Sequence, residues 1–350
     1  MASSTVLTTR RSSWPRWVGP AAAGWSSIYG VLGLAWSAGA PGFPFGHEHD
    51  RYGETISVLD PVTRSGAAPV VAVLGLFGAL VAGALTRVAT RAAIAVAWVY
   101  AVGLTFVLPD YRPLIRVAYT PMLLIGEVGF AEMYPWPVLN QMLCIGGGLL
   151  WAGTAVVATR RRRSSCTSCG RADAAEGTDG RLAAARWGRV ATYVAVGVPL
   201  IYCLTRWAWA LGIPLGVSRE FLRAGEADTP GIWLIGAMLG TLGAGGAVLT
   251  LGLIQRWGEI YPRWIPGLRG KTVRPRTAIV PATLVAIMVT TAGLMYVRIT
   301  VLGQLPGEFR ENVATVGPEL FWPLWGIALG AATYAYHLRR RPACRVCGRS

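Results

Sequence analysis

Eight segments of the chain are apolar over about 20 residues each, and they limit the fold more than any other feature of the sequence. A helix of that length crosses a hydrocarbon core about 30 Å thick. Only 14% of the residues are charged, against roughly a quarter in soluble domains, so most of the surface has to face lipid. We therefore expect an all-α integral membrane protein with about eight transmembrane helices, at residues 20–39, 67–86, 91–109, 137–159, 189–212, 231–254, 278–299 and 319–338.

The basic residues alternate across these spans. A net charge of +16 would suggest a nucleic-acid partner for a soluble protein. With the N-terminus inside, however, 24 of the 33 basic residues fall in inner segments, 8 fall in outer segments, and Arg206 falls within a span. This distribution obeys the positive-inside rule. It predicts a multi-pass protein of a bacterial cytoplasmic (inner) membrane with both termini in the cytoplasm, and it argues against nucleic acid as a partner.

Two long connections are expected to lie at the membrane surfaces. The inner segment 256–276 is basic, contains tryptophan and is interrupted by proline. We expect it on the inner headgroup layer, where arginine and lysine attract anionic lipid, so the expected partners are the bilayer and anionic inner-leaflet lipid. The outer segment 110–136 is too apolar for a solvated loop and too irregular for a span. We expect an interfacial or re-entrant helix there.

A basic, cysteine-containing tag occurs twice. "RRRSSCTSCGR" begins at Arg161 and "RRRPACRVCGR" begins at Arg339, each directly after an apolar segment. Upstream, "YGVLGLAWSAGAP" from Tyr29 aligns with "YCLTRWAWALGIP" from Tyr202, and "RAAI" from Arg91 aligns with "RTAI". Three matching blocks in the same order predict two four-span repeats, which are parallel because four spans return the chain to its starting side. The expected divisions are a cytoplasmic tail (1–19), a first repeat with its tag (20–171), a cytoplasmic linker (172–188) and a second repeat with its tag (189–350).

Each tag contains two cysteines that are separated by two residues and followed by glycine. That spacing lets both thiolates reach one metal ion, and glycine permits the tight turn that directs backbone N–H groups at sulfur. The repeat axis would bring the two tags together at the cytoplasmic face. We therefore predict one structural zinc ion bound by Cys166, Cys169, Cys344 and Cys347. Two alternatives stay open: a redox-active set of thiols, and cysteines that bind no metal.

Arg206 lies about 9 Å below the outer end of its expected span. A charge at that depth is costly unless it is paired or hydrated. It either binds an anionic group or pairs with an outer carboxylate such as Glu127, or it extends past neighbouring tryptophans to the outer headgroups. No carboxylate lies securely inside an expected span, which argues against a proton pump built on buried acids.

Other polar residues near the outer face are weaker candidates. The segment His47-Glu48-His49-Asp50 could bind a metal ion through imidazole and carboxylate groups. A solvated loop tip is the simpler interpretation, because the spacing identifies no further ligand. Asn140 and Gln141 open the fourth span and could line a solute site, although polar residues at span ends are usually interfacial.

Three stretches, "AWSAGAPGFPFG", "WPVLNQMLCIGGGLLWAG" and "RWGEIYPRWIPGLRGKTV", resemble a group of uncharacterised multi-spanning membrane proteins from GC-rich bacteria. A single lysine, Lys271, among the 33 basic residues fits such a genome. The resemblance implies a polytopic membrane fold over most of the chain and no particular activity.

Three classes of function are compatible with these features. The first is a transporter or channel for a small or anionic solute, with a site at the repeat interface near Arg206. The second is a membrane-embedded enzyme that uses His47, His49, Asp110 and Glu127 in the outer loops. The third is a sensor or scaffold whose metal-bound tags dock a cytoplasmic partner. The sequence favours the first class, because pseudo-symmetric spans with an arginine away from the centre suit a solute cavity.

Overall fold

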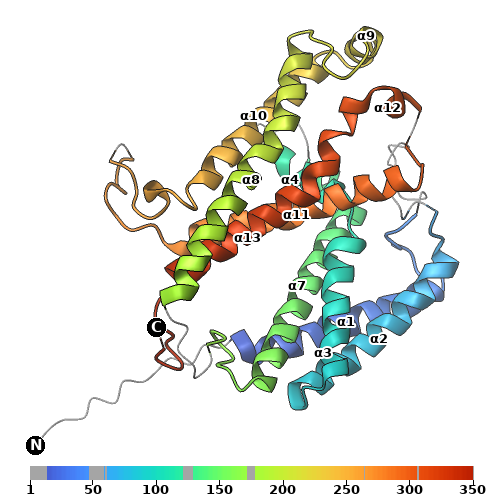
Figure 1. The fold of residues 1–350 in the computed structure, drawn as a ribbon. Helices are drawn as coiled ribbons and strands as arrows, with labels where there is room; N and C mark the ends of the chain where they lie inside the picture. Colours follow the sequence, from blue (N-terminus) through green and yellow to red (C-terminus); the bar gives the residue numbers. More distant parts are fainter. Residues whose placement is uncertain are drawn as a thin grey trace, which may run out of the picture.

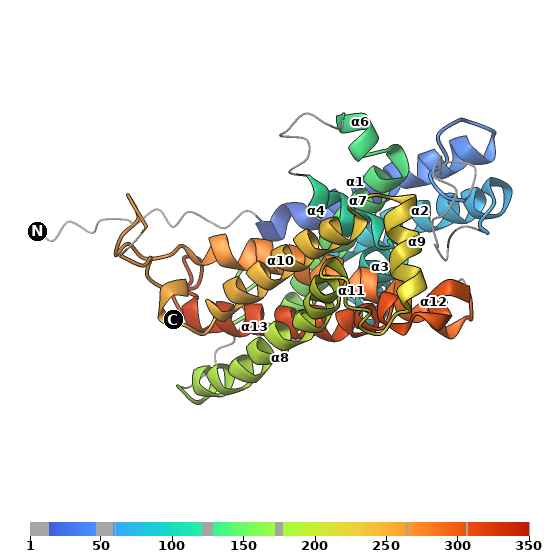
Figure 2. The same cartoon turned by 90° about the horizontal axis from the view of Figure 1, so that it is seen from above.

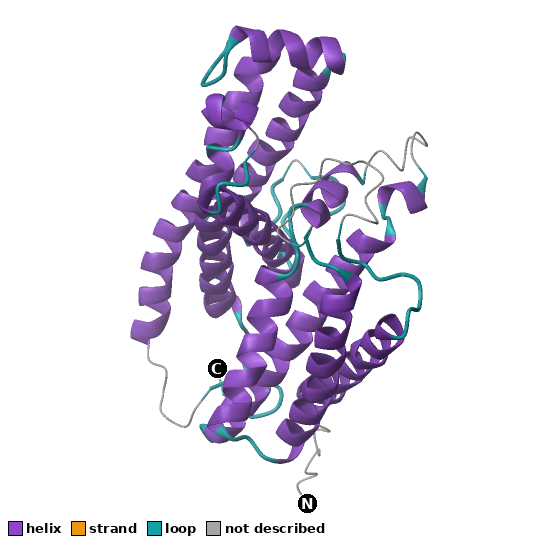
Figure 3. Cartoon of the chain, turned by 90° about the vertical axis from the view of Figure 1, so that its right-hand side faces the viewer, coloured by secondary structure: helices purple, strands orange, loops and turns teal. Residues whose placement is uncertain are grey.

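The fold is entirely helical. The computed structural model describes residues 14–46, 59, 61–120, 129–171, 178–263, 265–305 and 307–349. Helix accounts for 74% of it, and the described residues include no strand (Figure 3). The α-helices are α1 (Trp14–Ser37), α2 (Arg64–Arg87), α3 (Arg91–Val102), α4 (Arg112–Tyr119), α6 (Phe130–Met133), α7 (Trp136–Arg162), α8 (Thr178–Ala210), α9 (Arg219–Asp228), α10 (Ile232–Leu251), α11 (Pro275–Val301), α12 (Gly307–Glu311) and α13 (Trp322–Arg340).

Shorter helical turns connect these helices. A π-helical turn, η2 (Gly103–Val107), continues α3, and three 3-10 turns are η3 (Arg256–Gly258), η4 (Val313–Thr315) and η5 (Pro318–Phe321). The segment expected to be a linker before the fifth span is shorter than its sequence suggested. Helix α8 begins at Thr178, because the stretch from Leu182 to Arg186 consists of alanine, leucine and arginine, which favour helix.

Five helices are long and apolar enough to cross a membrane: α2, α7, α8, α10 and α11. A sixth span is possible if α3 with η2 is counted together with α4, although the two parts are bent by 59°. This bend occurs where the sequence predicts an interfacial or re-entrant segment after residue 109. The remaining expected spans coincide with α1, of 24 residues, and α13, of 19 residues, which are richer in tryptophan and tyrosine.

The long helices form two groups of four. In the first group α1 packs on α2 and α7, and α3 packs on α7. In the second group α8 packs on α10 and α13, and α11 packs on α13. The two groups lie side by side, with α2 and α8 on opposite sides of the molecule (Figures 1 and 2). Each group buries its own apolar core, one around Trp151 of α7 and the other around Tyr336 of α13.

Glycine lets α1 and α2 approach until their backbones touch. A Cβ atom built on Gly75 would lie 2.3 Å from the backbone nitrogen of Gly30, and one built on Gly33 would lie 2.3 Å from that of Ala72. The equivalent crossing of α8 and α10 is looser, since a Cβ on Gly240 would lie 3.4 Å from the Cα atom of Cys203. Small residues therefore determine how closely the first two helices of each group pack.

The two groups meet where η2 packs on α11. A π-helical turn leaves carbonyl groups available for other donors. The Thr291 hydroxyl donates to the carbonyl of Thr105 at 2.9 Å, and the Arg298 guanidinium donates to the carbonyl of Val107 at 2.6 Å. Two backbone carbonyls of the π-helical turn in the first group therefore accept hydrogen bonds from side chains of the second group.

Candidate functional site

The two tags extend directly from the ends of α7 and α13. In the first tag the N–H of Cys166 donates to the carbonyl of Arg171 at 3.0 Å, and the N–H of Gly170 donates back to Cys166 at 2.7 Å. The second tag repeats both bonds, from Cys344 to Arg349 and from Gly348 to Cys344, at 2.8 Å each. Both glycines have positive φ, 80° and 72°, which explains why glycine follows the second cysteine of each tag.

The tags bind each other reciprocally. The guanidinium of Arg171 donates to the carbonyls of Arg349 at 2.7 Å and Pro342 at 3.2 Å, and the guanidinium of Arg349 donates to the carbonyl of Arg171 at 3.0 Å. Arg171 is only 4% exposed, although it is charged. The final arginine of each tag therefore joins the two tags and thereby the ends of the two helix groups.

The four cysteine side chains meet between the tags. The sulfurs of Cys166 and Cys344 are 4.0 Å apart, and those of Cys169 and Cys347 are 3.6 Å apart. All four sulfurs lie within 4.8 Å of one another, and none is in a disulfide. Four thiolates around an ion at a metal–sulfur distance of about 2.3 Å would be about 3.8 Å apart at the corners of a tetrahedron. The cluster is therefore able to bind one metal ion.

The thiols of the tag cysteines differ in pKa. Burial opposes ionisation of Cys344, but hydrogen bonds from the backbone N–H groups of Cys347 and Val346 lower the pKa of its thiol to about 7. Burial and the neighbouring sulfurs instead raise the pKa of Cys169 to about 12, against the effect of the Arg171 N–H. Some of the thiols thus ionise readily and others resist the accumulation of negative charge. A bound cation supplies the charge that lets four thiolates coexist.

Arg206 forms a buried ion pair. Its Nη2 atom lies 2.6 Å from Oε1 of Glu319, and the two side chains are 12% and 4% exposed. The guanidinium also lies over the rings of Tyr202 and Trp209, at 4.5 Å and 4.3 Å from their centroids. Its carboxylate partner is thus Glu319 of η5, and aromatic rings enclose the side chain.

Asn140 and Gln141 both point into the protein, at the start of α7. The Tyr29 hydroxyl donates to Oδ1 of Asn140 at 2.8 Å, while the Nδ2 group of Asn140 has no partner in the described part of the chain. Gln141 donates to the carboxylate of Asp110 at 2.9 Å and accepts from its backbone N–H at 3.1 Å.

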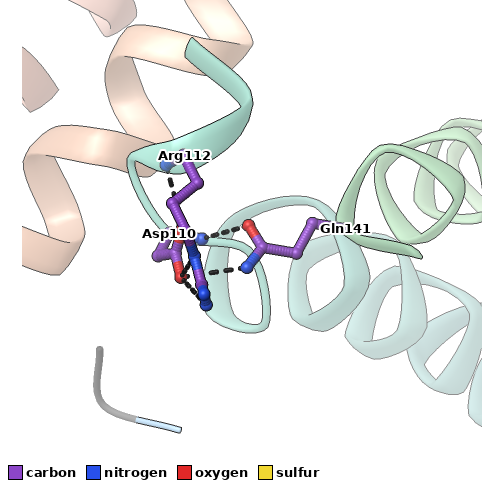
Figure 4. Close-up of polar contacts among 3 residues, drawn as sticks. All are labelled: Asp110, Arg112 and Gln141. Atoms are coloured by element: carbon purple, nitrogen blue, oxygen red, sulfur yellow. Dashed lines mark hydrogen bonds and ion pairs between the residues drawn. The ribbon is translucent and has the colours of Figure 1, made fainter. Parts of the chain in front are cut away.

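Asp110 also forms an ion pair with Arg112. Nη2 of Arg112 lies 2.6 Å from Oδ2 of Asp110, and the Arg112 backbone N–H donates to Oδ1 at 2.9 Å (Figure 4). Asp110 is 3% exposed. This network anchors the turn between η2 and α4 to α7, which is a structural role for Asp110 and Gln141.

The remaining predicted site residues lie outside the described residues: His47, Glu48, His49, Asp50 and Glu127. Glu319 is a buried residue that the sequence analysis missed, because it is the first residue of the expected span 319–338 and residues at span ends are usually interfacial. The sequence contained one signal for it. Glu319 lies 178 positions after Gln141, the spacing of the paired cysteines, so Glu319 in η5 corresponds in the repeat to Gln141 near the start of α7.

Comparison of the chain with protein-family models, with curated proteins and with solved structures finds no match. What the site can do is therefore argued from its own geometry.

Proposed function

We propose that this chain is a membrane-embedded scaffold or sensor whose two four-helix halves are joined at the cytoplasmic face by one structural zinc ion. The observation that carries this proposal is the cluster of four thiols contributed in pairs by the two tags. Zinc is favoured because it prefers four tetrahedral sulfur ligands in closed structural sites. The clamp leaves no ligand position open, so a structural role fits it better than catalysis.

The proposed topology has eight spans, with both termini in the cytoplasm of a bacterial cell, and two parallel repeats, 20–171 and 189–350. Three kinds of contact support the repeats. The first helix of each group packs on the second and fourth, and the third packs on the fourth. A Cβ on Gly148 of α7 would meet Oγ1 of Thr105 at 2.1 Å, and a Cβ on Gly326 of α13 would meet Oγ1 of Thr290 at 2.0 Å.

Contacts at the inner ends support the same correspondence. Arg161 donates to the carbonyl of Thr86 at the end of α2, and Arg339 donates to the carbonyl of Leu253 just after α10. Arg161 and Arg339 are the first residues of the two tags. Each tag therefore begins with an arginine that caps the second helix of its own half.

Elemental mass spectrometry of the detergent-purified protein tests the zinc clamp. We expect about one zinc per chain, lost when Cys166 and Cys344 are both replaced by serine, because two remaining thiolates bind zinc weakly. Cys144→Ser with Cys203→Ser is the matched control, since these cysteines are buried within α7 and α8 and away from the tags. Absence of metal from protein purified under reducing conditions would contradict the proposal, and cysteines recovered as disulfides would favour the redox alternative.

Transport of a small solute is the second candidate. It is supported by the buried pair of Arg206 and Glu319, in which Oε2 of Glu319 has no partner among the described residues. The indole N–H of Trp322, in the same aromatic cluster, also has none within that part of the chain. A polar solute would satisfy such groups. Phosphate flux into proteoliposomes tests this candidate, because H2PO4− has O–H groups to donate to Oε2 and oxygens to accept from the indole N–H. Flux above that of empty vesicles, lost in Glu319→Gln, supports it, and equal flux contradicts it.

A further inference from the structure

The connection between the second and third helices differs between the two groups. In the first group α2 ends at Arg87 and α3 begins at Arg91, and the two helices pack on each other. In the second group α10 ends at Leu251 and α11 begins only at Pro275, and α10 makes its main contacts with α8 and α9. Helix α10 is also the least buried candidate span, with 11% of its apolar window buried. The second half is therefore open where the first half is closed.

A cavity of about 770 Å³ occupies this opening. Its walls come from the C-terminal end of α10, the N-terminal part of α11, the N-terminal half of α13 and the connection after α10. The lining is almost wholly apolar and includes Leu249, Trp257, Val285, Trp325 and Leu329. The volume falls within the range of about 300–1,000 Å³ that encloses small-molecule ligands. An occupant of this cavity has to be mainly hydrocarbon.

The connection that covers the cavity is held in a defined conformation. The backbone pairs Tyr261 with Lys271, and Val273 with Glu259, at 3.0 Å and 2.9 Å. The hydroxyl of Tyr336 on α13 donates to the carbonyl of Gly258 at 2.8 Å. These bonds attach the connection to α13, so the cavity is a built feature of the fold.

Exposed arginines are next in the chain to several residues that line the cavity. Arg256 lies between Gln255 and Trp257, both of which line the cavity, and Arg274 and Arg276 lie between the lining residues Val273 and Thr277. The acidic residue of this connection, Glu259, faces Arg339 and Arg340 at 3.7 Å and 3.6 Å. The backbone that carries the apolar lining therefore also carries exposed positive charge.

We propose that this cavity binds an anionic phospholipid of the inner leaflet, with an acyl chain among the apolar residues and the phosphate on Arg256 and Arg276. The combination of hydrocarbon-lined volume and exposed arginines matches the two ends of such a lipid. Arginines near a membrane surface attract anionic lipid. The inference rests on the proposed topology, which puts this end of α10 and α11 at the cytoplasmic face.

Native mass spectrometry of the full chain with phosphatidylglycerol or phosphatidylcholine tests the site. We expect phosphatidylglycerol to be retained in preference, and Arg256→Gln with Arg276→Gln to weaken its binding about tenfold or more. Arg87→Gln with Arg91→Gln is the matched control, because both are exposed arginines at the corresponding junction of the first half, where the helices pack together. It should retain the wild-type affinity. Ala282→Phe, which projects into the cavity from α11, should weaken binding of both lipids.

Two outcomes would overturn the inference. Equal binding of the two lipids by the wild type means that the arginines recognise no phosphate-bearing anionic lipid. Equal losses in the two arginine variants mean that net charge holds the lipid and the cavity does not. Zinc measured in the same samples separates this inference from the clamp, since the arginine variants should keep their metal. A chain that selects phosphatidylglycerol but contains no zinc would leave the lipid site standing without the clamp.

Discussion

At the scale of single residues, the polar groups buried by this protein occur in networks. Asp110 is held by Arg112 and Gln141, and Glu319 is held by Arg206. The pairing of Arg206 follows from the cost of an isolated charge below the headgroups. The rings of Tyr202 and Trp209 complete the enclosure of the Arg206 guanidinium. Function at Arg206 therefore has to involve the pair, because the guanidinium is already neutralised.

Breaking this pair on one side should destabilise the protein. We expect Arg206→Gln to lower the free energy of unfolding by about 3–5 kcal/mol, because it leaves the Glu319 carboxylate buried without a counter-ion. Adding Glu319→Gln should recover much of the loss, since no charge then remains. Thermal unfolding in detergent measures both. Arg223→Gln, at an exposed arginine of α9, is the control. If the double variant loses the sum of the single losses, the two residues are not coupled.

At the scale of helices, small residues decide which faces pack. The sequence of α2 contains glycine and alanine four positions apart at Gly75, Ala79 and Gly83, but the helix buries Ala72, Gly75, Gly78 and Ala82 against its neighbours. A Cβ on Gly83 would have no heavy atom within 4 Å. Composition shows that close packing is possible, and the neighbouring helix selects the face.

Two glycines of α2 should therefore respond differently to the same substitution. Gly75→Leu should lower the melting temperature clearly, at a cost of about 1–3 kcal/mol or more, because its Cβ would overlap the backbone of Gly30. Gly83→Leu adds the same side chain to the same helix and should leave stability nearly unchanged. Thermal unfolding of the two variants in the same detergent provides the comparison. Equal losses would mean that α1 and α2 do not cross at Gly75.

At the scale of the whole molecule, the described parts of the two halves make contact where η2 and α4 pack on α11 and again where tag meets tag. The first contact is far from the cysteines along the helices. The second depends on Arg171 and Arg349 and, in our proposal, on zinc. Removing the metal should therefore release the cytoplasmic ends while the helix contacts persist.

Cysteine labelling with a membrane-impermeant maleimide tests both the release of the tags on metal removal and the proposed topology. We expect labelling of the tag cysteines in inverted membrane vesicles only after zinc is chelated, and none in intact cells, because the proposed topology puts the tags in the cytoplasm. Cys144 and Cys203 should stay unlabelled in the folded protein, as they are 1% and 0% exposed. Labelling of the tags in intact cells would reverse the proposed orientation. Labelling without chelation would argue against a bound metal.

The sequence by itself determined the helical class, the long apolar helices and the grouping of the four cysteines. The helices follow from hydropathy and the pairing of cysteines within each tag follows from their spacing, which are local properties. The meeting of the two tags, 178 positions apart, was expected from the internal repeat. The tertiary structure decided which carboxylate meets Arg206, which face of α2 packs, and where the cavity beside α10 opens. Each of these depends on contacts between residues distant in sequence, and for such contacts the sequence offered only the weak signal of its internal repeat.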